Sequence, residues 1–134
     1  TARQQALQQA RSIWINDAYW VFMPFKLKDS GVKLEYLGAD TTQSGQAADL
    51  LQLTFEEVGD TPQNKYQVWV GKSDHLVRQW AYFSEANDEA PKFVLPWDNY
   101  QPQGELLLSG DRGERQITDI KVLESVPEGA FSQP

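Results

Sequence analysis

The sequence predicts a mainly β domain of the α+β class, in which an N-terminal helical segment packs on an antiparallel sheet. Three observations predict this fold. Apolar residues recur at helical spacing only near the N-terminus, the spacing changes to two residues from Val32 onward, and short turns rather than helices separate the segments of period two. At 134 residues the chain can bury a core without disulfides, and we expect one domain over residues 1–134.

The N-terminal helix is expected over residues 2–15. The polar pair Asn16 and Asp17 interrupts its pattern and is suited to cap a second short helical turn over residues 18–22. Pro24 ends that turn, because proline disfavours a helical conformation at the residue before it. The apolar side chains of the first segment fall on one helical face, opposite Gln and Arg: Ala2, Ala6, Leu7, Ala10, Ile13 and Trp14.

About six strands are expected after Val32, each with apolar and polar residues in alternation. A short seventh strand over residues 92–97 is restricted by Pro96 to an edge or an end. Consecutive strands without intervening helices predict an antiparallel meander in one sheet, with polar loops at 38–48 and 84–91. The six strands cover residues 32–37, 50–56, 66–71, 76–83, 105–109 and 115–123.

Composition excludes several kinds of site. The chain has no cysteine and one histidine, which excludes disulfides, thiolate zinc sites, iron–sulfur clusters, cysteine nucleophiles and multi-histidine metal sites. We therefore expect no metal and no cofactor. The formal net charge of -7 argues against electrostatically driven binding to nucleic acid or to anionic lipid.

The sequence also bears on the compartment. Its longest nearly unbroken apolar stretch, residues 18–25, is far shorter than the about 20 residues that a membrane-spanning helix needs. Residues 1–11 lack the basic and apolar regions of a signal peptide. Two interpretations stay open at this point: a cytosolic protein, or the mature or trimmed form of an exported protein.

No arrangement of residues predicts catalysis. His75 lies next to Ser73 and Asp74 in one turn, whereas a catalytic triad needs residues that converge from separate elements. The glycines of segment 110–113 lack the following helix and the Lys-Ser/Thr ending of a phosphate-binding loop. Several carboxylates fall on strand ends and turns, where solubilising charge is the expected role: Glu56, Glu57, Asp74, Asp98 and Asp111.

The unusual feature of the sequence is its aromatic content of 12%. Four of the aromatic residues crowd into segment 19–25, namely Tyr19, Trp20, Phe22 and Phe25, with Trp14 just before it and Met23 within it. This crowding predicts either a lid that seals the core or the wall of an apolar ligand cavity, which aromatic rings and a flexible methionine line readily. Trp69 and Trp80, on neighbouring predicted strands, suit either role.

Two segments resemble proteins with the LolA/LolB-like lipoprotein-sorting fold, and more closely the exported relatives of that superfamily that have no established carrier role. The segments are NDAYWVFMPFKLKDSGVKLEYLG, residues 16–38, and LLQLTFEEVGDTPQNKYQVWV, residues 50–70. The final segment PEGAFSQP, residues 127–134, is similar to the ending of such chains. The resemblance spans most of residues 16–134, and its first segment is the specific part.

The resemblance implies a strongly curved antiparallel sheet, an incomplete barrel, with the helical segment on its concave face. In the carrier proteins of that superfamily, this concavity holds the acyl chains of a lipoprotein in transit across the periplasm. The residues expected at the mouth of the cavity are Trp14, Tyr19, Trp20, Phe22, Met23 and Phe25. Those expected to line it from the strands are Tyr36, Leu53, Phe55, Val68 and Trp80. No catalytic residue follows from the resemblance.

Family members carry further strands and a helix before the segment that begins at Asn16. We therefore expect this chain to lack N-terminal strands of the full family fold. The sheet edge left free in this way would be a pairing site, so a homodimer or strand exchange through that edge is expected.

Together these inferences favour a non-enzymatic protein of the periplasm or cell envelope that binds a lipid, an acyl chain or another apolar ligand in the concave face of the sheet. The alternative is a protein–protein interaction module that uses the sheet edge or the acidic surface, with the aromatic residues as plain core. An enzyme with an Asp/Glu pair is a third hypothesis, which requires two carboxylates that converge in a pocket. No nucleic acid partner and no membrane-spanning segment are expected, and a cytoplasmic location stays open.

Overall fold

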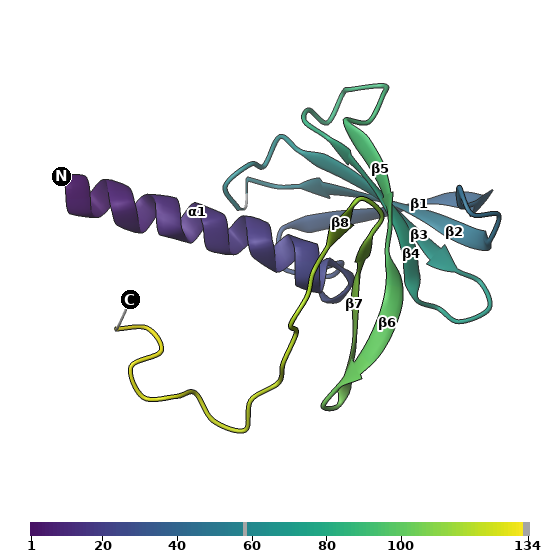
Figure 1. The fold of residues 1–134 in the computed structure, drawn as a ribbon. Coiled ribbons are helices and arrows are strands. Elements are labelled where there is room, and N and C mark those ends of the chain that lie inside the picture. Colours follow the sequence, from purple (N-terminus) through teal and green to yellow (C-terminus); the bar gives the residue numbers. More distant parts are fainter. Residues whose placement is uncertain (58, 133–134) are drawn as a thin grey trace.

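The computed structural model describes residues 1–57 and 59–132 of the chain. Val58, in segment 50–70 of the resemblance, and residues 133–134, in segment 127–134, lie outside the described residues. One long helix and two antiparallel sheets make up the fold, and the sheets are not closed into a barrel (Figure 1). This confirms the predicted α+β class with a curved antiparallel sheet. The elements are α1 (Ala2–Phe22), the 3-10 helix η1 (Met23–Phe25), β1 (Val32–Thr41), β2 (Ala47–Phe55), β3 (Lys65–Gly71), β4 (Val77–Phe83), β5 (Phe93–Pro96), β6 (Asp98–Gln103), β7 (Leu106–Arg112) and β8 (Arg115–Gln116).

Strands β1 to β5 form an antiparallel meander in which each strand pairs with the next one along the chain. Successive side chains of a strand point to opposite faces, and directly paired residues share a face. The register pairs Leu53 with Tyr66 and Val68 with Trp80, so these four side chains lie on one face of the sheet. Trp69 points to the other face, as the alternation in the sequence predicts.

Helix α1 begins with a capping box. The Thr1 hydroxyl accepts a hydrogen bond from Gln4 N at 3.2 Å, and the Gln4 side chain accepts one from Thr1 N at 3.0 Å. The helix then runs without interruption to Phe22, so the break predicted at Asn16 and Asp17 is wrong. The side chains of these two residues are exposed and hydrogen-bond each other at 3.4 Å, and therefore they do not compete for the helix backbone.

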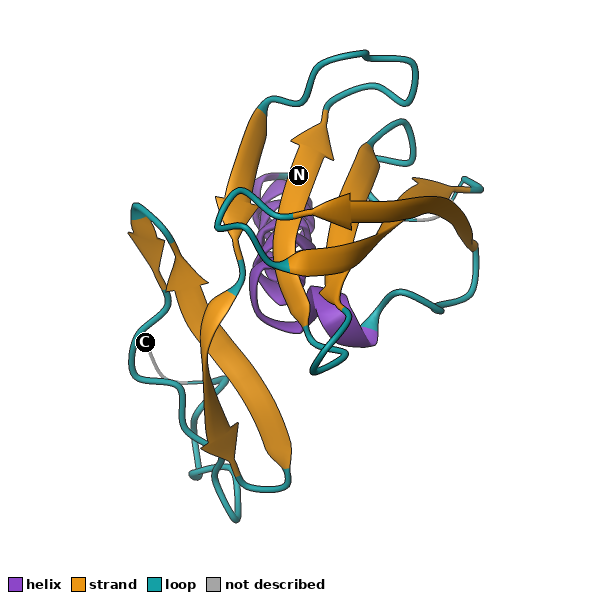
Figure 2. Cartoon of the chain, turned by 90° about the vertical axis from the view of Figure 1, so that its right-hand side faces the viewer, coloured by secondary structure: helices purple, strands orange, loops and turns teal. Residues whose placement is uncertain are grey.

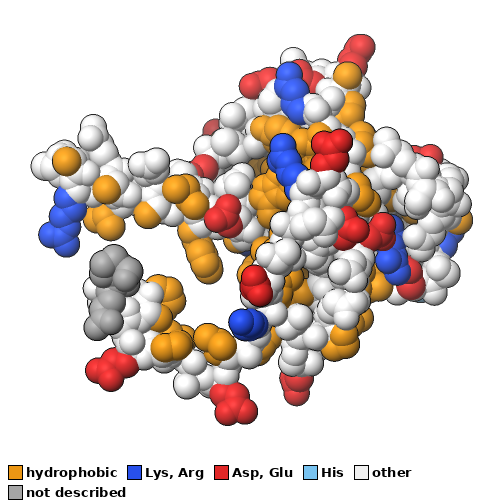
Figure 3. Space-filling view, in the orientation of Figure 1, with side chains coloured by type: hydrophobic (Ala, Val, Ile, Leu, Met, Phe, Trp, Pro, Cys, Tyr) orange, Lys and Arg blue, Asp and Glu red, His pale blue; other side chains and the backbone are white. Residues whose placement is uncertain are grey.

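The N-terminal part of α1 projects beyond the sheet, and no residue of the helix is fully buried (Figure 1). Its predicted apolar face is open to solvent, with Leu7, Ile13 and Trp14 more than half exposed. Figure 3 shows this apolar surface across a hollow from further apolar side chains on the segment that follows β8. Only the C-terminal end of the helix packs on the sheet, through Tyr19 and Trp20.

A second sheet contains β6, β7 and β8 and stands apart from the first (Figure 2). The chain passes between the sheets at Trp97, which is fully buried and donates its backbone N–H to Arg78 O at 2.9 Å. Pro96 ends β5, since proline has no N–H to extend the ladder. The chain changes direction at this point and starts a second sheet. The prediction of a single sheet is therefore wrong.

The strands differ from the sequence prediction in three further places. β1 continues through residues 38–41, which were expected to be a loop, after a bulge between Tyr36 and Gly38. β6 was not predicted, because its residues DNYQPQ show no apolar alternation. The strand predicted over 115–123 ends at Gln116, and residues 117–132 are irregular because no strand pairs with them.

Two apolar clusters lie on opposite faces of the first sheet. The main core, beneath the C-terminal end of α1, contains the buried residues Met23, Leu53, Val68, Val77, Trp80 and Trp97. The smaller cluster contains Ala48, Trp69, Ala81 and Phe83. Among the described residues, no helix has the length and apolar content needed to cross a bilayer.

Candidate functional site

A groove of about 970 Å³ lies between α1 and the face of the first sheet that the helix partly covers. Its position follows from the fold, because α1 contacts the sheet only at its C-terminal end and leaves the outer part of the face open. The groove is lined by residues from all five strands of this sheet, with Val32 at the start of β1. Its aromatic lining consists of Tyr19, Trp20, Phe55, Tyr66, Trp80, Tyr82 and Phe93.

A stack of three rings forms the floor of the groove. The ring of Tyr66 stacks on Tyr19 with a centroid distance of 5.6 Å and on Trp80 with a centroid distance of 5.7 Å. Phe55 meets both tyrosines edge-on, at 6.3 and 6.0 Å. These contacts join the helix to β2, β3 and β4, and they hold the aromatic side chains in fixed positions before any ligand arrives.

The β5 end of the groove is formed by Trp20, Tyr82 and Phe93. The Trp20 ring stands perpendicular to Trp80 at 4.9 Å and lies 5.8 Å from Phe93. Phe93 also contacts Tyr82 at 5.4 Å. Trp80 is 1% exposed, and its Nε1–H has no hydrogen-bond partner within residues 1–57 and 59–132.

Polar groups surround this aromatic floor. The groove side of α1 carries Gln8, Ser12 and Asn16, which belong to the polar face of the helix. At the β2 end, Asn64 is buried, and its side-chain oxygen accepts a hydrogen bond from the Tyr82 hydroxyl at 3.3 Å. An apolar floor with a polar rim is typical of a site for a small organic ligand.

The phenol groups of the floor stay protonated at neutral pH. Burial raises the pKa of Tyr66 far above its ordinary value of 10.0, and the nearby tyrosines add to this rise. Burial likewise raises the pKa of Tyr19, with a further contribution from Asp29. Neither tyrosine can therefore act as a base in neutral solution, and the floor presents uncharged rings to a ligand.

The structure brings part of the predicted site together. Tyr19, Trp20, Phe55 and Trp80 line the groove. Met23, Leu53 and Val68 lie in the filled core beneath it and are fully buried. The other predicted residues lie away from the groove: Trp14, 70% exposed on the projecting part of α1; Phe22 and Phe25, exposed at the end of the helix; and Tyr36, exposed on β1.

Several groove residues were not named from the sequence. Tyr66, Tyr82 and Phe93 share the face of Trp80, and their alternation in the strands was the available signal. Lys26 reaches the groove from a segment with no such pattern, whereas Arg115 begins segment 115–123, whose alternation predicted a strand but did not indicate the groove. Lys26 Nζ forms an ion pair with Asp29 Oδ2 at 2.7 Å and lies 5.7 Å from the centroid of the Tyr19 ring.

Asp74 and Arg78, outside the groove, form an ion pair that stabilises the turn between β3 and β4. Asp74 accepts hydrogen bonds from Arg78 at 2.6 Å and from the Leu76 backbone at 3.0 Å. Although burial opposes it, this bonding lowers the pKa of the Asp74 carboxyl. The carboxylate of Asp74 therefore pairs with Arg78, and it forms no hydrogen bond with the exposed His75. Within residues 1–57 and 59–132, no three or more His, Asp or Glu side chains gather as metal ligands would.

A second, smaller groove of about 420 Å³ lies between η1 and the hairpin of β6 and β7. Phe25, Leu106 and Leu107 line it, together with His75 and Glu105. These side chains are largely exposed, and two Phe or Tyr rings, Phe25 and Tyr100, line this groove, whereas seven Phe, Tyr or Trp rings line the first.

The geometry thus defines a candidate site for a small apolar or amphipathic molecule, with uncharged aromatic rings as its floor. Comparisons of the chain with protein-family models, with curated proteins and with solved structures found no match. The similarity of residues 16–38 and 50–70 to the lipoprotein-sorting fold therefore stays a prediction, and the site's own geometry carries the functional argument.

Proposed function

We propose that this chain is a non-enzymatic binding protein that holds an apolar ligand, such as a lipid or an acyl chain, in the groove between α1 and the first sheet. The observation that carries the proposal is this groove of about 970 Å³ over a preformed aromatic floor. Small-molecule sites usually measure about 300–1,000 Å³. The resemblance of residues 16–38 to exported proteins supports placing this activity in the periplasm or cell envelope.

The floor of the groove limits how deeply a ligand can enter. Leu53, Val68 and Trp80 fill the inner part of the concavity and are almost completely buried. A ligand therefore lies along the outer groove on the rings of Tyr66 and Phe55 rather than inside the core. This arrangement favours ligand exchange, because no part of the core has to open for the ligand to leave.

The expected affinity also suits a ligand that is released. A 12-carbon acyl chain that is fully buried gains roughly 0.8 kcal/mol for each CH₂ group, or about 10 kcal/mol in total. Association costs about 4–15 kcal/mol. An open groove buries less than the whole chain, so binding of weak to moderate strength is expected.

A charge placed in the floor tests the proposal. Tyr19→Glu is expected to weaken binding of the neutral fluorescent probe N-phenyl-1-naphthylamine by at least about tenfold, because a carboxylate would be desolvated beneath the probe. The measurement is a fluorescence titration, with circular dichroism to verify that the variant keeps its fold. Lipid extraction of the gently purified protein, followed by mass spectrometry, would identify a natural ligand.

Trp14→Glu is the matched control for this experiment. Trp14 lies on the same helix, is 70% exposed and does not line the groove, so this variant should bind the probe like the unmodified protein. Equal binding by the Tyr19→Glu variant, or equal loss in both variants, would place the probe outside the groove and contradict the proposal.

The free edge of β1 favours a second candidate function, self-association through strand pairing. β1 has ten residues, pairs with β2 alone among residues 1–57 and 59–132, and exposes Tyr36 and Leu37. An uncovered edge of this length is a template for another strand, and a second copy of the same chain offers an antiparallel β1.

Sedimentation velocity tests this second function. A dimer is expected, and Leu37→Lys should convert it to a monomer because a lysine on an edge strand disfavours edge-to-edge pairing. Leu106→Lys is the control, since Leu106 is exposed to the same extent, 43%, but lies on β7 in the other sheet. A monomeric unmodified chain would rule out this function.

A further inference from the structure

The charges that line the groove are separated along it. Asp60 lies at the β2 end, in the connection between β2 and β3, and Asp29 lies in the link before β1. Arg115 of β8 lies at the opposite end, with its guanidinium 5.1 Å from the centroid of the Trp20 ring. Because the sheet order is β1 to β5, the groove runs from an end that holds Asp60 and the Lys26–Asp29 ion pair to an end that holds Arg115.

The two cations of the groove differ in their partners. Lys26 is neutralised by Asp29 at 2.7 Å. Arg115 has no carboxylate within 4.0 Å in the described part of the chain, although Asp111 lies close in the same hairpin. The carboxylate of Asp111 is occupied elsewhere, since it accepts hydrogen bonds from Gly113 N at 2.7 Å and from Gln116 Nε2 at 2.8 Å.

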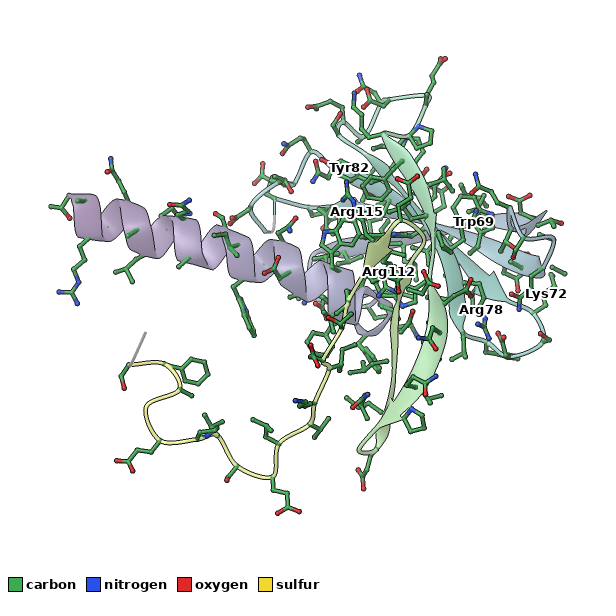
Figure 4. The ribbon with its side chains drawn as sticks, in the orientation of Figure 1. Trp69, Lys72, Arg78, Tyr82, Arg112 and Arg115 are labelled. Atoms are coloured by element: carbon green, nitrogen blue, oxygen red, sulfur yellow. The ribbon has the colours of Figure 1, made fainter. Side chains whose placement is uncertain are left out.

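The hairpin that carries Arg115 is held in place. Arg112, directly across the ladder from Arg115, is completely buried and donates a hydrogen bond to the backbone oxygen of Trp20 at 2.7 Å. The same turn includes Gly113, whose φ of 76° lies in the left-handed region that favours glycine. The backbone of Arg115 is therefore held close to Trp20 by the bond of Arg112. A paired hairpin rather than a loop carries the Arg115 side chain, and Figure 4 labels both arginines on it.

From this arrangement we propose that the ligand of the groove is an amphipathic carboxylate. Its carboxylate binds the guanidinium of Arg115, and its apolar part lies over Trp20 and the ring of Tyr66 toward Phe55. Arginine suits this role because its planar fork pairs with a carboxylate in two hydrogen bonds. Asp60 disfavours the reverse orientation, because it leaves the β2 end with a net negative charge beside the Lys26–Asp29 ion pair. The inference rests on the proposed function, of which it names the ligand class.

The test compares two ligands with the same chain, dodecanoate and dodecanol, by displacement of N-phenyl-1-naphthylamine at about pH 8, where the carboxylate is ionised. The unmodified protein is expected to bind dodecanoate about tenfold more tightly than dodecanol, the size of one charge-assisted hydrogen-bonded contact. Arg115→Gln should remove this preference, because the substitution weakens the binding of dodecanoate much more than the binding of dodecanol. Added salt should also reduce the preference, because Arg115 is exposed.

Arg11→Gln is the control variant, since Arg11 is exposed on α1 and does not line the groove; it should keep the full preference. The inference is overturned if the unmodified protein binds dodecanol as tightly as dodecanoate, or if the Arg115→Gln variant keeps the preference. Failure of the protein to bind the probe or either ligand would instead contradict the proposed function itself. The two failures are therefore distinguishable.

Discussion

Replacing Trp80 with alanine is expected to lower the free energy of unfolding by about 3–5 kcal/mol, the range found when a large buried aromatic side chain is removed. Trp80 is 1% exposed and lies where α1, the first sheet and the start of the second sheet meet. Its ring contacts Trp20 of α1 at 4.9 Å, Tyr66 of β3 at 5.7 Å and Trp97, where the chain enters the second sheet, at 5.2 Å. Alanine would leave a cavity where helix and sheets meet.

Urea unfolding, followed by circular dichroism, measures this loss. Trp80→Phe should cost less than Trp80→Ala, because phenylalanine keeps most of the packing and removes an indole N–H that has no hydrogen-bond partner in the described chain. Trp14→Ala is the control and should change stability by no more than about 0.5 kcal/mol, because Trp14 is 70% exposed. Similar values for the Trp80→Ala and Trp14→Ala variants would contradict the central position assigned to Trp80.

The first sheet could be predicted because burial of one face leaves a clear period of two. Leu51, Leu53 and Phe55 alternate with polar residues on β2, and the predicted strand differs from the observed one mainly at its start. β6 left no such pattern, since Tyr100 is its main inward-facing side chain. The segment after Gln116 shows the converse case, in which alternation is present but no neighbouring strand is available to pair with it.

The aromatic content near residue 20 indicated the region of the groove, but its shape depends on how α1 is oriented. The apolar pattern of the helix predicts that Leu7 and Trp14 share a face, and it does not specify that this face points to solvent. The groove exists because the polar face, with Gln8 and Ser12, is turned toward the sheet instead. Tertiary contacts of Tyr19 and Trp20 set this rotation, and they involve residues more than 35 positions away in the sequence.

Arg115 could not be predicted as a groove residue for a related reason. Its position depends on the second sheet folding back toward α1, and the contact that holds the sheet there involves Arg112 and the backbone of Trp20, which are 92 positions apart. A backbone acceptor leaves no signal in the sequence. Such long-range contacts determine the charge distribution of the groove, and local patterns of hydrophobicity do not report them.

Removing Arg112 is expected to cost about 3 kcal/mol of stability, because its guanidinium holds the second sheet against the end of α1. Arg112 is completely buried, and burial lowers the pKa of its guanidinium to about 10, so the side chain remains cationic at neutral pH. It donates to Trp20 O at 2.7 Å, to Ser109 O at 2.9 Å and to Ser109 Oγ at 2.7 Å, and its guanidinium lies 3.3 Å from the centroid of the Trp97 ring. The last turn of α1 has no basic residue of its own, and Arg112 supplies the positive charge that its carbonyl end favours.

Arg112→Ala would leave buried carbonyl oxygens without donors, each at a cost of about 1–3 kcal/mol, partly offset because no guanidinium has to be desolvated. Arg112→Lys should recover only part of the loss, since an ammonium group cannot form the planar fork or stack on Trp97. Urea unfolding measures both variants, and Arg3→Ala on the exposed start of α1 is the control. A change of less than about 0.5 kcal/mol for the Arg112→Ala variant would mean that the second sheet stays docked without this contact. Arg115 would then owe its place at the groove to the other contacts of the second sheet, such as the buried Trp97 and the hydrogen bond from the Tyr100 hydroxyl to Val77 O at 2.8 Å. The stability of the Arg112 variants is therefore an independent test of how the cationic end of the groove is built.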